Sequence, residues 1–266
     1  MNKIDKDVIS TINVINRNFK ENYDEIFFAS NEMLYNIFSN FSVSGKDVLT
    51  VLASGDQAFH CFKNGAKSVD LFDINPLTFY YYYLRVWTIK YSNQFYPNRD
   101  FNSKDIKKLL RKVSIKSDYE RDAYEYWKKL IEIDEFVFSK IFYDEVLKYP
   151  DNQIDDLSLL KKRFKEDIEF YNIDITKYFI YKKKYDVIIT SNISEYYNDT
   201  FTLVSYWDNL KSMLNENGII VSSNVIRSEV GLVEKLTFED TFTINPMSED
   251  IYGGIKKSLG YIYKRI

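Results

Sequence analysis

The sequence predicts an α/β fold built on a doubly wound, mostly parallel sheet. Short, continuous apolar runs are typical of strands that are covered on both faces. Helical patterns separate these runs, as in folds that alternate strand and helix. Only four Pro and eight Gly occur in 266 residues, and no linker rich in Ser, Gly and Pro divides the chain. We therefore expect one large domain, with room for an inserted subdomain.

Two helical patterns, at 5–20 and 22–40, precede the first strand pattern. The second has apolar residues spaced by three and four positions, which is typical of an amphipathic helix. Gly45 ends this pattern. We expect residues 1–44 to form an N-terminal helical cap on a core domain at 45–266.

The core domain opens with a βαβ pattern. The apolar run at 48–53 predicts a strand, which ends in the turn signal Ser54-Gly55-Asp56. A helix is expected at 57–64 and a second strand at 68–72. A long helix then begins near Pro76 and extends to about Tyr91, with Pro at a position that helix starts favour.

The remaining chain predicts a helical insertion followed by more of the sheet. Residues 104–165 are charged, amphipathic and nearly free of Gly, so we expect an insertion at about 92–165. The later elements are strands at 168–173, 185–190 and 218–223, a helix at about 200–215, and a candidate antiparallel pair at 235–244 and 258–265. These strands bring the expected sheet to seven.

Composition excludes several classes of function. The formal net charge of −3 gives no electrostatic basis for non-specific nucleic-acid binding. Cys61 and His60 are the single residues of their types, which excludes an intramolecular disulfide, a multi-cysteine zinc site and a His-based metal centre within one chain. We interpret both as structural and expect no metal.

Targeting signals are not evident in the sequence. The first seven residues are polar and acidic, whereas a signal peptide shows a basic start and then an apolar run. No segment approaches the ~20 apolar residues of a membrane span. The expected compartment is the cytoplasm.

Polar clusters follow four of the predicted strands. In an open parallel sheet, ligands bind beyond the carboxyl ends of the strands, near the point where strand order reverses. The first cluster, Ala53-Ser54-Gly55-Asp56-Gln57, is a turn of small residues where backbone N–H groups and a helix start can approach a ligand. It lacks the full G-x-G-x-x-G pattern.

Asp73 ends the second predicted strand, eighteen residues after Gly55. That offset is close to the roughly 20 residues at which an acidic side chain reaches the ribose hydroxyls of a bound nucleoside. The alternative is that Asp73 caps the helix beginning near Pro76.

The third and fourth clusters are Ile173-Asp174-Ile175-Thr176 and the segment from Thr190 to Tyr197. Asp174 can accept a hydrogen bond from an adenine amino group while the neighbouring apolar side chain packs on the ring. Its alternative is again a helix cap. Four such clusters in the expected order are more specific than any one of them.

These residues resemble the S-adenosylmethionine-dependent methyltransferases of the Rossmann-like class, over about 45–266 without 92–165. Residues 48–57 resemble the first motif of that family. Asp73, which is followed by Ile74 and Asn75, resembles its ribose-binding acid, and Ile173-Asp174, which is followed by Ile175, resembles its adenine-contacting pair. The segment 185–192, which ends in Ser191 and Asn192, resembles its fourth motif. This sequence departs from the family in having a single glycine in the first motif.

A closer similarity is to the branch that contains the betaine-lipid 3-amino-3-carboxypropyltransferases. The segment Ser54-Gly55-Asp56-Gln57, followed by Gly65-Ala66 and by Asp73-Ile74-Asn75-Pro76, is similar to the pattern of that branch.

The resemblance implies S-adenosylmethionine as co-substrate, without a metal, and methyl transfer to a small-molecule acceptor. Transfer of the 3-amino-3-carboxypropyl group is the alternative, and a non-catalytic S-adenosylmethionine-binding or scaffold protein is a third. Because sulfonium charge makes the attached carbons electrophilic, such an enzyme mainly aligns the acceptor and excludes water. Glu195 or Tyr196 is the candidate base for a hydroxyl or amide acceptor, and an ordinary surface turn is the alternative.

Three further segments allow a functional and a structural interpretation. Asp56 is a candidate to bind the donor's amino group. The segment Ser30-Asn31-Glu32 can close over the donor, or Ser30 or Asn31 can simply cap a helix. Tyr80 to Tyr83 point all round a helix, so we expect them to pack in the core. We expect the 92–165 segment to cover the acceptor site.

Overall fold

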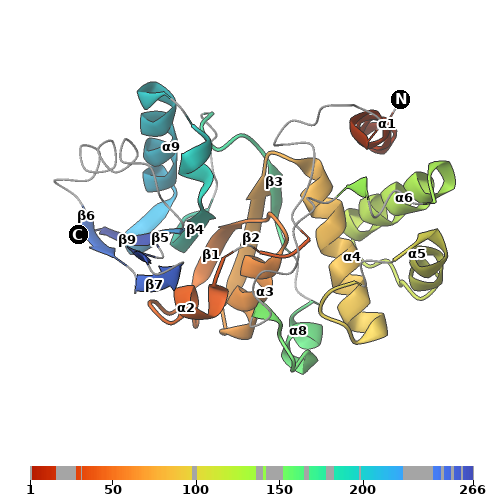
Figure 1. Cartoon of the computed structure of the whole chain (residues 1–266), viewed down its shortest axis with the longest axis horizontal. Coiled ribbons are helices and arrows are strands. Elements are labelled where there is room, and N and C mark those ends of the chain that lie inside the picture. The colour runs from red at the N-terminus through yellow and green to blue at the C-terminus, as the bar shows by residue number, and fades with distance from the viewer. Residues whose placement is uncertain are drawn as a thin grey trace. The chain divides into compact units, whose positions relative to one another are not determined.

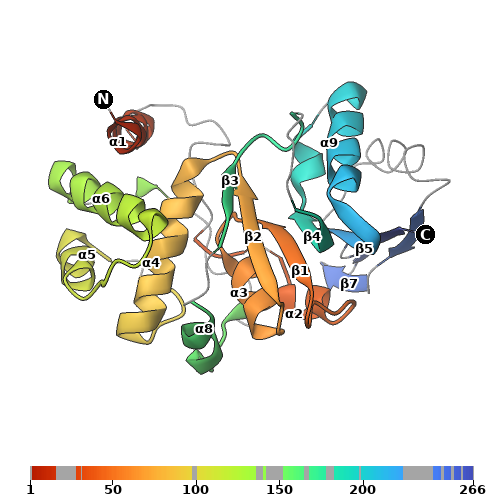
Figure 2. The same ribbon diagram turned by 180° about the vertical axis from the view of Figure 1, so that it is seen from behind.

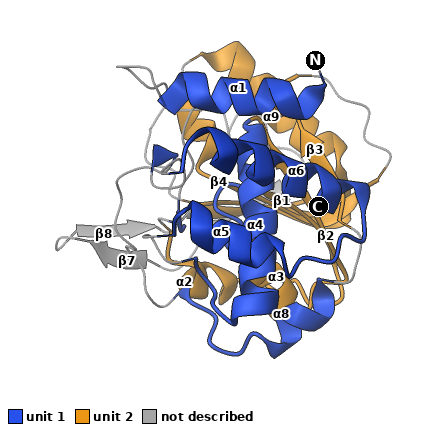
Figure 3. Ribbon diagram, turned by 90° about the vertical axis from the view of Figure 1, so that its right-hand side faces the viewer, with its two compact units in different colours: residues 1–31, 52–56, 75–167 blue, residues 32–51, 57–74, 168–266 orange. Residues whose placement is uncertain are grey.

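The computed structural model describes residues 2–15, 28–30, 32–97, 101–135, 140–141, 152–164, 168–177, 183–197, 199–223, 242–246, 249–252, 255–258 and 260–265. The chain forms two compact units, coloured in Figure 3. Unit 1 comprises 1–31, 52–56 and 75–167, and unit 2 comprises 32–51, 57–74 and 168–266. Within the described ranges, no helix has the length and apolar character needed to cross a membrane.

Unit 2 contains a sheet with the strand order β3-β2-β1-β4-β5-β9-β6 (Figures 1 and 2). The strands are β1 (Asp47–Val51), β2 (Ser68–Asp73), β3 (Phe170–Asn172), β4 (Tyr185–Ser191), β5 (Leu214–Ser223), β6 (Phe242–Pro246) and β9 (Gly260–Arg265). The first five run parallel, and β9 is antiparallel to both β5 and β6. The prediction of an α/β fold with a mostly parallel sheet is confirmed.

The central strands are covered on both faces, as their continuous apolar sequences indicate. In β1, Val48 and Leu49 are both fully buried although they point to opposite faces. Right-handed crossovers place α3 (Asp56–Lys63) and α9 (Thr200–Ser212) on opposite faces, because the chain leaves β1 and β4 in opposite directions across the sheet. Figure 1 shows α9 above the strands and α3 below them.

At the two ends of unit 2, the helices and strands have other bounds than those predicted from the sequence. The helix expected at 22–40 is α2 (Leu34–Phe38), and residues 16–27 lie outside the described part of the chain. The strand expected at 235–244 corresponds to β6, which begins at Phe242 after an undescribed segment. The strands β7 (Glu249–Tyr252) and β8 (Ile255–Ser258) pair in a separate two-stranded sheet that the pattern did not indicate.

Unit 1 is helical over most of its described length. Its helices are α1 (Lys3–Ile15), α4 (Pro76–Ser92), α5 (Ser103–Leu110), α6 (Asp118–Ile133) and α8 (Ser158–Arg163). Helix α6 contacts α1, α4 and α5, and α4 is buried all round from Leu77 to Ile89. A helix that is apolar on every side belongs inside a core. The helical character expected for 104–165 is therefore present in α5, α6 and α8.

The four consecutive tyrosines of α4 are all buried, so the core-packing prediction is confirmed. Tyr80 stacks on Tyr126 with ring centroids 3.9 Å apart, and the Trp127 indole N–H donates to the Tyr80 carbonyl at 2.8 Å. The Tyr81 hydroxyl donates to the Phe28 carbonyl at 2.8 Å. Each polar atom named here has a partner, which is how tyrosine and tryptophan are accommodated in a core.

Candidate functional site

The order in which the chain adds strands to the sheet reverses between β1 and β4. From β1 the chain builds β2 and β3 on one side, and it then returns to build β4 and β5 on the other. The carboxyl ends of β1 and β4 therefore form a topological switch point, where open α/β sheets bind their ligands. The polar residues at this edge of unit 2 define the candidate site.

A buried carboxylate, Glu32, joins three elements at this edge. It lies just before α2 and accepts a hydrogen bond from the Gln57 amide, in the first turn of α3, at 2.8 Å. It also accepts from the Ser191 hydroxyl, at the end of β4, at 2.7 Å, and from the Ser223 hydroxyl, at the end of β5. We call these four residues the Glu32 cluster. The cluster ties the segment before α2 to the strand ends.

Burial governs the protonation of Glu32. Desolvation raises the pKa of its carboxyl above the ordinary value, and the hydrogen bonds from Ser223, Ser191 and Gln57 act against that rise. A desolvated carboxylate favours a cationic group beside it, because the low dielectric of its surroundings strengthens the attraction. The cluster can therefore recognise a positively charged ligand group.

The end of β4 is conformationally strained. Ser191 has a φ of 56°, in the left-handed region that residues with a side chain rarely adopt. The register between β4 and β5 shifts here, and the Ser222 hydroxyl donates to the Ser191 carbonyl at 3.1 Å. Strain of this kind persists only where surrounding contacts determine the conformation, and it is often found at functional sites.

The turn that follows β1 belongs to unit 1 and contains a second buried carboxylate. Asp56 is fully buried, and one of its oxygens lies 2.6 Å from the Arg85 guanidinium. Its other oxygen accepts from the Ser30 backbone N–H and from the Ser54 hydroxyl. Arg85 also donates to the Ser54 carbonyl at 2.8 Å. The carboxylate that we expected to bind the donor's amino group is thus engaged within the protein.

Arg85 was not identified from the sequence. It is completely buried in α4, where it donates to the Phe95 carbonyl at 3.2 Å and lies over the Tyr96 and Phe95 rings at 4.3 and 4.6 Å. Burial is the largest single influence and acts to lower its pKa, but the charge and hydrogen bond of Asp56 together with the nearby Tyr81 and Tyr96 outweigh it, and the pKa is raised. The available signal was a lone cation within an apolar helix, because arginine is almost never fully buried without a partner.

The turn itself shows why one glycine suffices in the first motif. Gly55 has a φ of 88° and donates its N–H to the Leu52 carbonyl. Ala53 also adopts the left-handed region, with a φ of 43°. An alanine therefore occupies a conformation that normally selects glycine.

Asp73 does not cap the helix that follows it. Helix α4 is capped by Asn75, whose side chain accepts from the Leu77 N–H at 2.9 Å. The capping alternative for Asp73 is therefore wrong, and Asn75, which the resemblance placed in the cofactor site, has this structural contact. In unit 2, Asp73 is half-buried at the end of β2, and Ile74 after it is 47% exposed.

Asp174 follows β3 in a turn. Its carboxylate accepts from the Thr176 N–H at 3.1 Å and from the Thr176 hydroxyl at 2.7 Å. No described helix begins here, so the helix-cap alternative for Asp174 is also wrong. Ile175 is buried, and its carbonyl accepts from Asn209 of α9 at 2.8 Å.

The candidate base residues lie in a short 3₁₀ turn after β4, Ile193–Tyr196. The Glu195 N–H donates to the Asn192 carbonyl at 2.9 Å, and the Asn192 side-chain oxygen lies 3.3 Å from the Ser191 hydroxyl oxygen. Glu195 is half-buried and Tyr196 is 37% exposed. Asn31 lies outside the described residues, and Ser30 does not cap α2, whose N-cap position is Met33.

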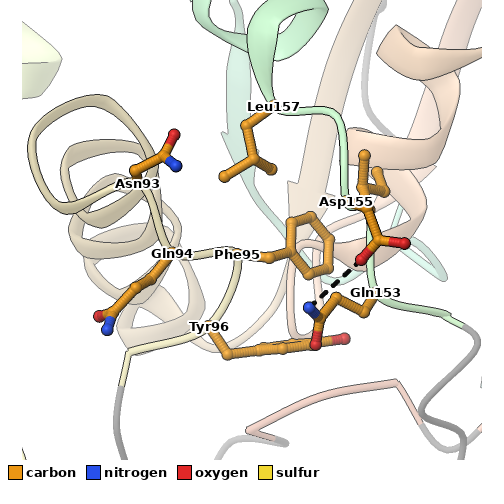
Figure 4. Close-up of a pocket in the computed structure, with 8 residues that line it drawn as sticks. Asn93, Gln94, Phe95, Tyr96, Gln153, Asp155 and Leu157 are labelled. Atoms are coloured by element: carbon orange, nitrogen blue, oxygen red, sulfur yellow. Dashed lines mark hydrogen bonds between the residues drawn. The ribbon is translucent and has the colours of Figure 1, made fainter.

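A pocket of about 360 Å³ lies within unit 1, lined by residues 93–96 and 153–155 together with Leu157. Figure 4 shows the Phe95 ring among these side chains, and the Gln153 amide pointing at the Asp155 carboxylate 3.5 Å away. The pocket therefore combines aromatic and amide surfaces with one carboxylate. Among the described residues, no group of His, Cys, Asp and Glu could hold a metal ion.

Comparisons with known proteins add no family assignment. No family model matches the chain, and no curated protein matches it. Similar solved structures include the N-methyltransferase NodS from Bradyrhizobium japonicum with S-adenosyl-L-homocysteine (12% identity, 97% of this chain and 98% of that one, TM-score 0.46). A methyltransferase from Pyrococcus furiosus matches with 11% identity over 98% and 96% of the two chains (TM-score 0.45). A TehB-like S-adenosylmethionine-dependent methyltransferase from Corynebacterium glutamicum matches with 8% identity over 89% of each chain (TM-score 0.44). These likenesses are too remote to carry an argument about the activity of this chain.

Proposed function

We propose that this protein is an S-adenosylmethionine-dependent transferase that transfers a methyl group to a small-molecule acceptor. One observation carries the proposal: the parallel strands β2, β3 and β4 lie in a sheet whose topological switch point is between β1 and β4, and they end at or just before Asp73, Asp174 and the Ser191-Asn192 pair. A nucleoside presents hydroxyl and amino donors, and these side chains are acceptors. Neither Asp73 nor Asp174 serves as the cap of a described helix.

The residues at the strand ends suit the parts of S-adenosylmethionine. Asp73 is assigned to the ribose hydroxyls, because one carboxylate can accept from both. Asp174 is assigned to the adenine amino group, and the exposed Ile74 to the face of the ring. Buried Ile175 supports this region through its packing. The remaining proposed contacts are Ala53, Ser54, Gly55, Asp56, Gln57, Asn75, Ser191, Asn192 and Asn31.

The co-substrate supplies an electrophilic carbon next to a positively charged sulfur. The protein's task is then to hold the acceptor in line with one carbon–sulfur bond and to exclude water. Glu195 and Tyr196 follow the strained end of β4 and are our candidates to take a proton from a hydroxyl or amide acceptor. The pocket within 92–165 is our candidate for acceptor recognition. We propose the cytoplasm as the compartment.

A second reaction, transfer of the 3-amino-3-carboxypropyl group, is favoured by the Ser54-to-Gln57 and Asp73-to-Pro76 segments. The two reactions use the same donor and differ in the carbon–sulfur bond that faces the acceptor. They also differ in product, which is S-adenosylhomocysteine for methyl transfer and 5′-methylthioadenosine for the other.

Calorimetric titration with S-adenosylmethionine, S-adenosylhomocysteine and 5′-methylthioadenosine tests the proposal. We expect micromolar binding that Asp73→Ala weakens by about 10- to 100-fold, the range for losing hydrogen bonds to a charged group. Tighter binding of S-adenosylhomocysteine than of 5′-methylthioadenosine supports methyl transfer.

The matched control is Asp208→Ala, on the exposed side of α9, where the carboxylate pairs with Lys211. It should leave all three affinities unchanged. If the wild-type protein binds none of the three compounds, the transferase proposal is wrong and a scaffold role takes its place.

A further inference from the structure

The orientation of the Gln57 side chain is fixed by its neighbour. Gln57 is buried in the first turn of α3, and its amide nitrogen donates to Glu32 Oε2 at 2.8 Å. A carboxylate oxygen accepts hydrogen bonds, so the amide has to present its NH₂ group to Glu32. The carbonyl oxygen, Gln57 Oε1, must then point away from Glu32.

Gln57 Oε1 is itself buried and has no hydrogen-bond partner in the part of the chain that the structure describes. Most buried polar atoms in proteins are hydrogen-bonded, and an unpaired acceptor is costly. The amide nitrogen of Gln57 has a hydrogen-bond partner and the oxygen of the same planar group has none among the described residues. The missing partner has to be a donor, because a carbonyl oxygen can only accept.

The unpaired oxygen lies in the part of unit 2 where a ligand is expected. Through Glu32, the Gln57 amide is connected to Ser191 at the end of β4 and to Ser223 at the end of β5. Gln57 also directly follows the turn after β1 in the sequence. The oxygen is thus part of the switch-point edge, together with a buried carboxylate that makes its surroundings attractive to a cation.

We propose that Gln57 Oε1 accepts a hydrogen bond from the α-ammonium group of the bound co-substrate, and that Glu32 is the positioning residue that orients the Gln57 amide for this contact. The inference rests on the proposed function and adds to it an ammonium subsite centred on Gln57. A cationic nitrogen fits better than a neutral hydroxyl, because it gains from the Glu32 charge as well as from the hydrogen bond.

The experiment compares two ligands that differ only in the amino group. S-adenosylhomocysteine carries it, and 5′-S-(3-carboxypropyl)-5′-thioadenosine lacks it. Both are titrated calorimetrically into wild-type protein and into the variants Gln57→Met and Glu32→Gln. Methionine keeps the length of the side chain and removes the oxygen.

We expect Gln57→Met to weaken S-adenosylhomocysteine binding by about 10- to 100-fold. Binding of the ligand without the amino group should change by less than about threefold, because neither partner of the lost contact is then present. Glu32→Gln should reduce the preference for the amino-bearing ligand in the same direction, and Glu32→Asp should restore part of it. The exposed substitution Lys63→Met, at the last residue of α3, is the matched control and should change neither affinity.

Equal weakening of both ligands by Gln57→Met would overturn the inference in favour of a structural role for Gln57. Unchanged affinity for S-adenosylhomocysteine would also overturn it. These two results leave the proposed function intact, because the wild-type protein then binds its ligands. Failure of the wild-type protein to bind either ligand would overturn the proposed function and the inference together.

Discussion

Two buried carboxylates, one in each unit, are stabilised in different ways. In unit 1, Asp56 faces the Arg85 guanidinium at 2.6 Å. In unit 2, Glu32 accepts hydrogen bonds from an amide and two hydroxyls, all of them neutral groups. The Asp56 charge is compensated within the protein and holds a turn in place. The Glu32 carboxylate is stabilised by these neutral dipoles, and not by a guanidinium as Asp56 is.

The difference appears in the protonation equilibria. Burial raises the pKa of Glu32, because the hydrogen bonds only partly offset the loss of water. For Arg85, burial is the largest influence and favours the neutral form, but Asp56, Tyr81 and Tyr96 together more than compensate, and the pKa is raised. The surroundings of Glu32 therefore favour its protonated form, and those of Arg85 favour its charged form.

The largest effect is expected from breaking the compensated pair. Arg85→Met leaves the Asp56 carboxylate buried without its guanidinium and should lower the free energy of unfolding by about 3–5 kcal/mol. Urea unfolding followed by circular dichroism measures this change.

The control for that prediction is Lys67→Met, which breaks the exposed Lys67–Asp47 pair. It should cost far less than Arg85→Met, because water screens exposed pairs. Equal costs for the two variants would show that the buried pair has no special importance.

The sequence predicted the sheet better than it predicted these two sites. Runs such as 48–53 and 185–190 identify their strands because both faces are covered and every position is apolar. Arg85 was missed because an apolar helix has no periodicity that reveals which neighbour a single cation meets. Spacing alone also did not separate Asp73 from Asn75 as the cap of α4, since both precede Pro76. Such choices depend on side-chain geometry, which is a property of the fold.

The second prediction concerns the carboxylate held by dipoles. Glu32→Gln removes a charge whose burial is unfavourable but places an amide next to the Gln57 amide. We expect a loss of about 1 kcal/mol, smaller than that for Arg85→Met, because one hydrogen bond is exchanged for a poorer contact.

The cost of Glu32→Gln should fall as the pH rises. A carboxyl whose pKa is raised on folding binds its proton more tightly in the native state, so its contribution to stability is lost as the pH increases from the unfolded pKa through the folded one. The variant has no such group. Urea unfolding of both proteins at pH 5 and pH 8 tests this, and an increase in the cost between the two pH values would contradict the raised pKa.

The smallest effect concerns the backbone near the two buried carboxylates. In each unit, a residue other than glycine beside the carboxylate has a φ in the left-handed region. These are Ala53, at 43°, in unit 1 and Ser191, at 56°, in unit 2. Ala53→Gly should stabilise the protein by about 0.5 kcal/mol, since relief of the left-handed conformation (~1 kcal/mol) exceeds the greater entropy of glycine in the unfolded chain (~0.5 kcal/mol).

Ala58→Gly, the same change within α3, should instead destabilise it by about 1 kcal/mol or more, because helical backbone disfavours glycine. If both variants lose stability equally in urea unfolding, the turn after β1 is not strained at Ala53, and the contacts of Asp56 and Arg85 hold it without conformational cost.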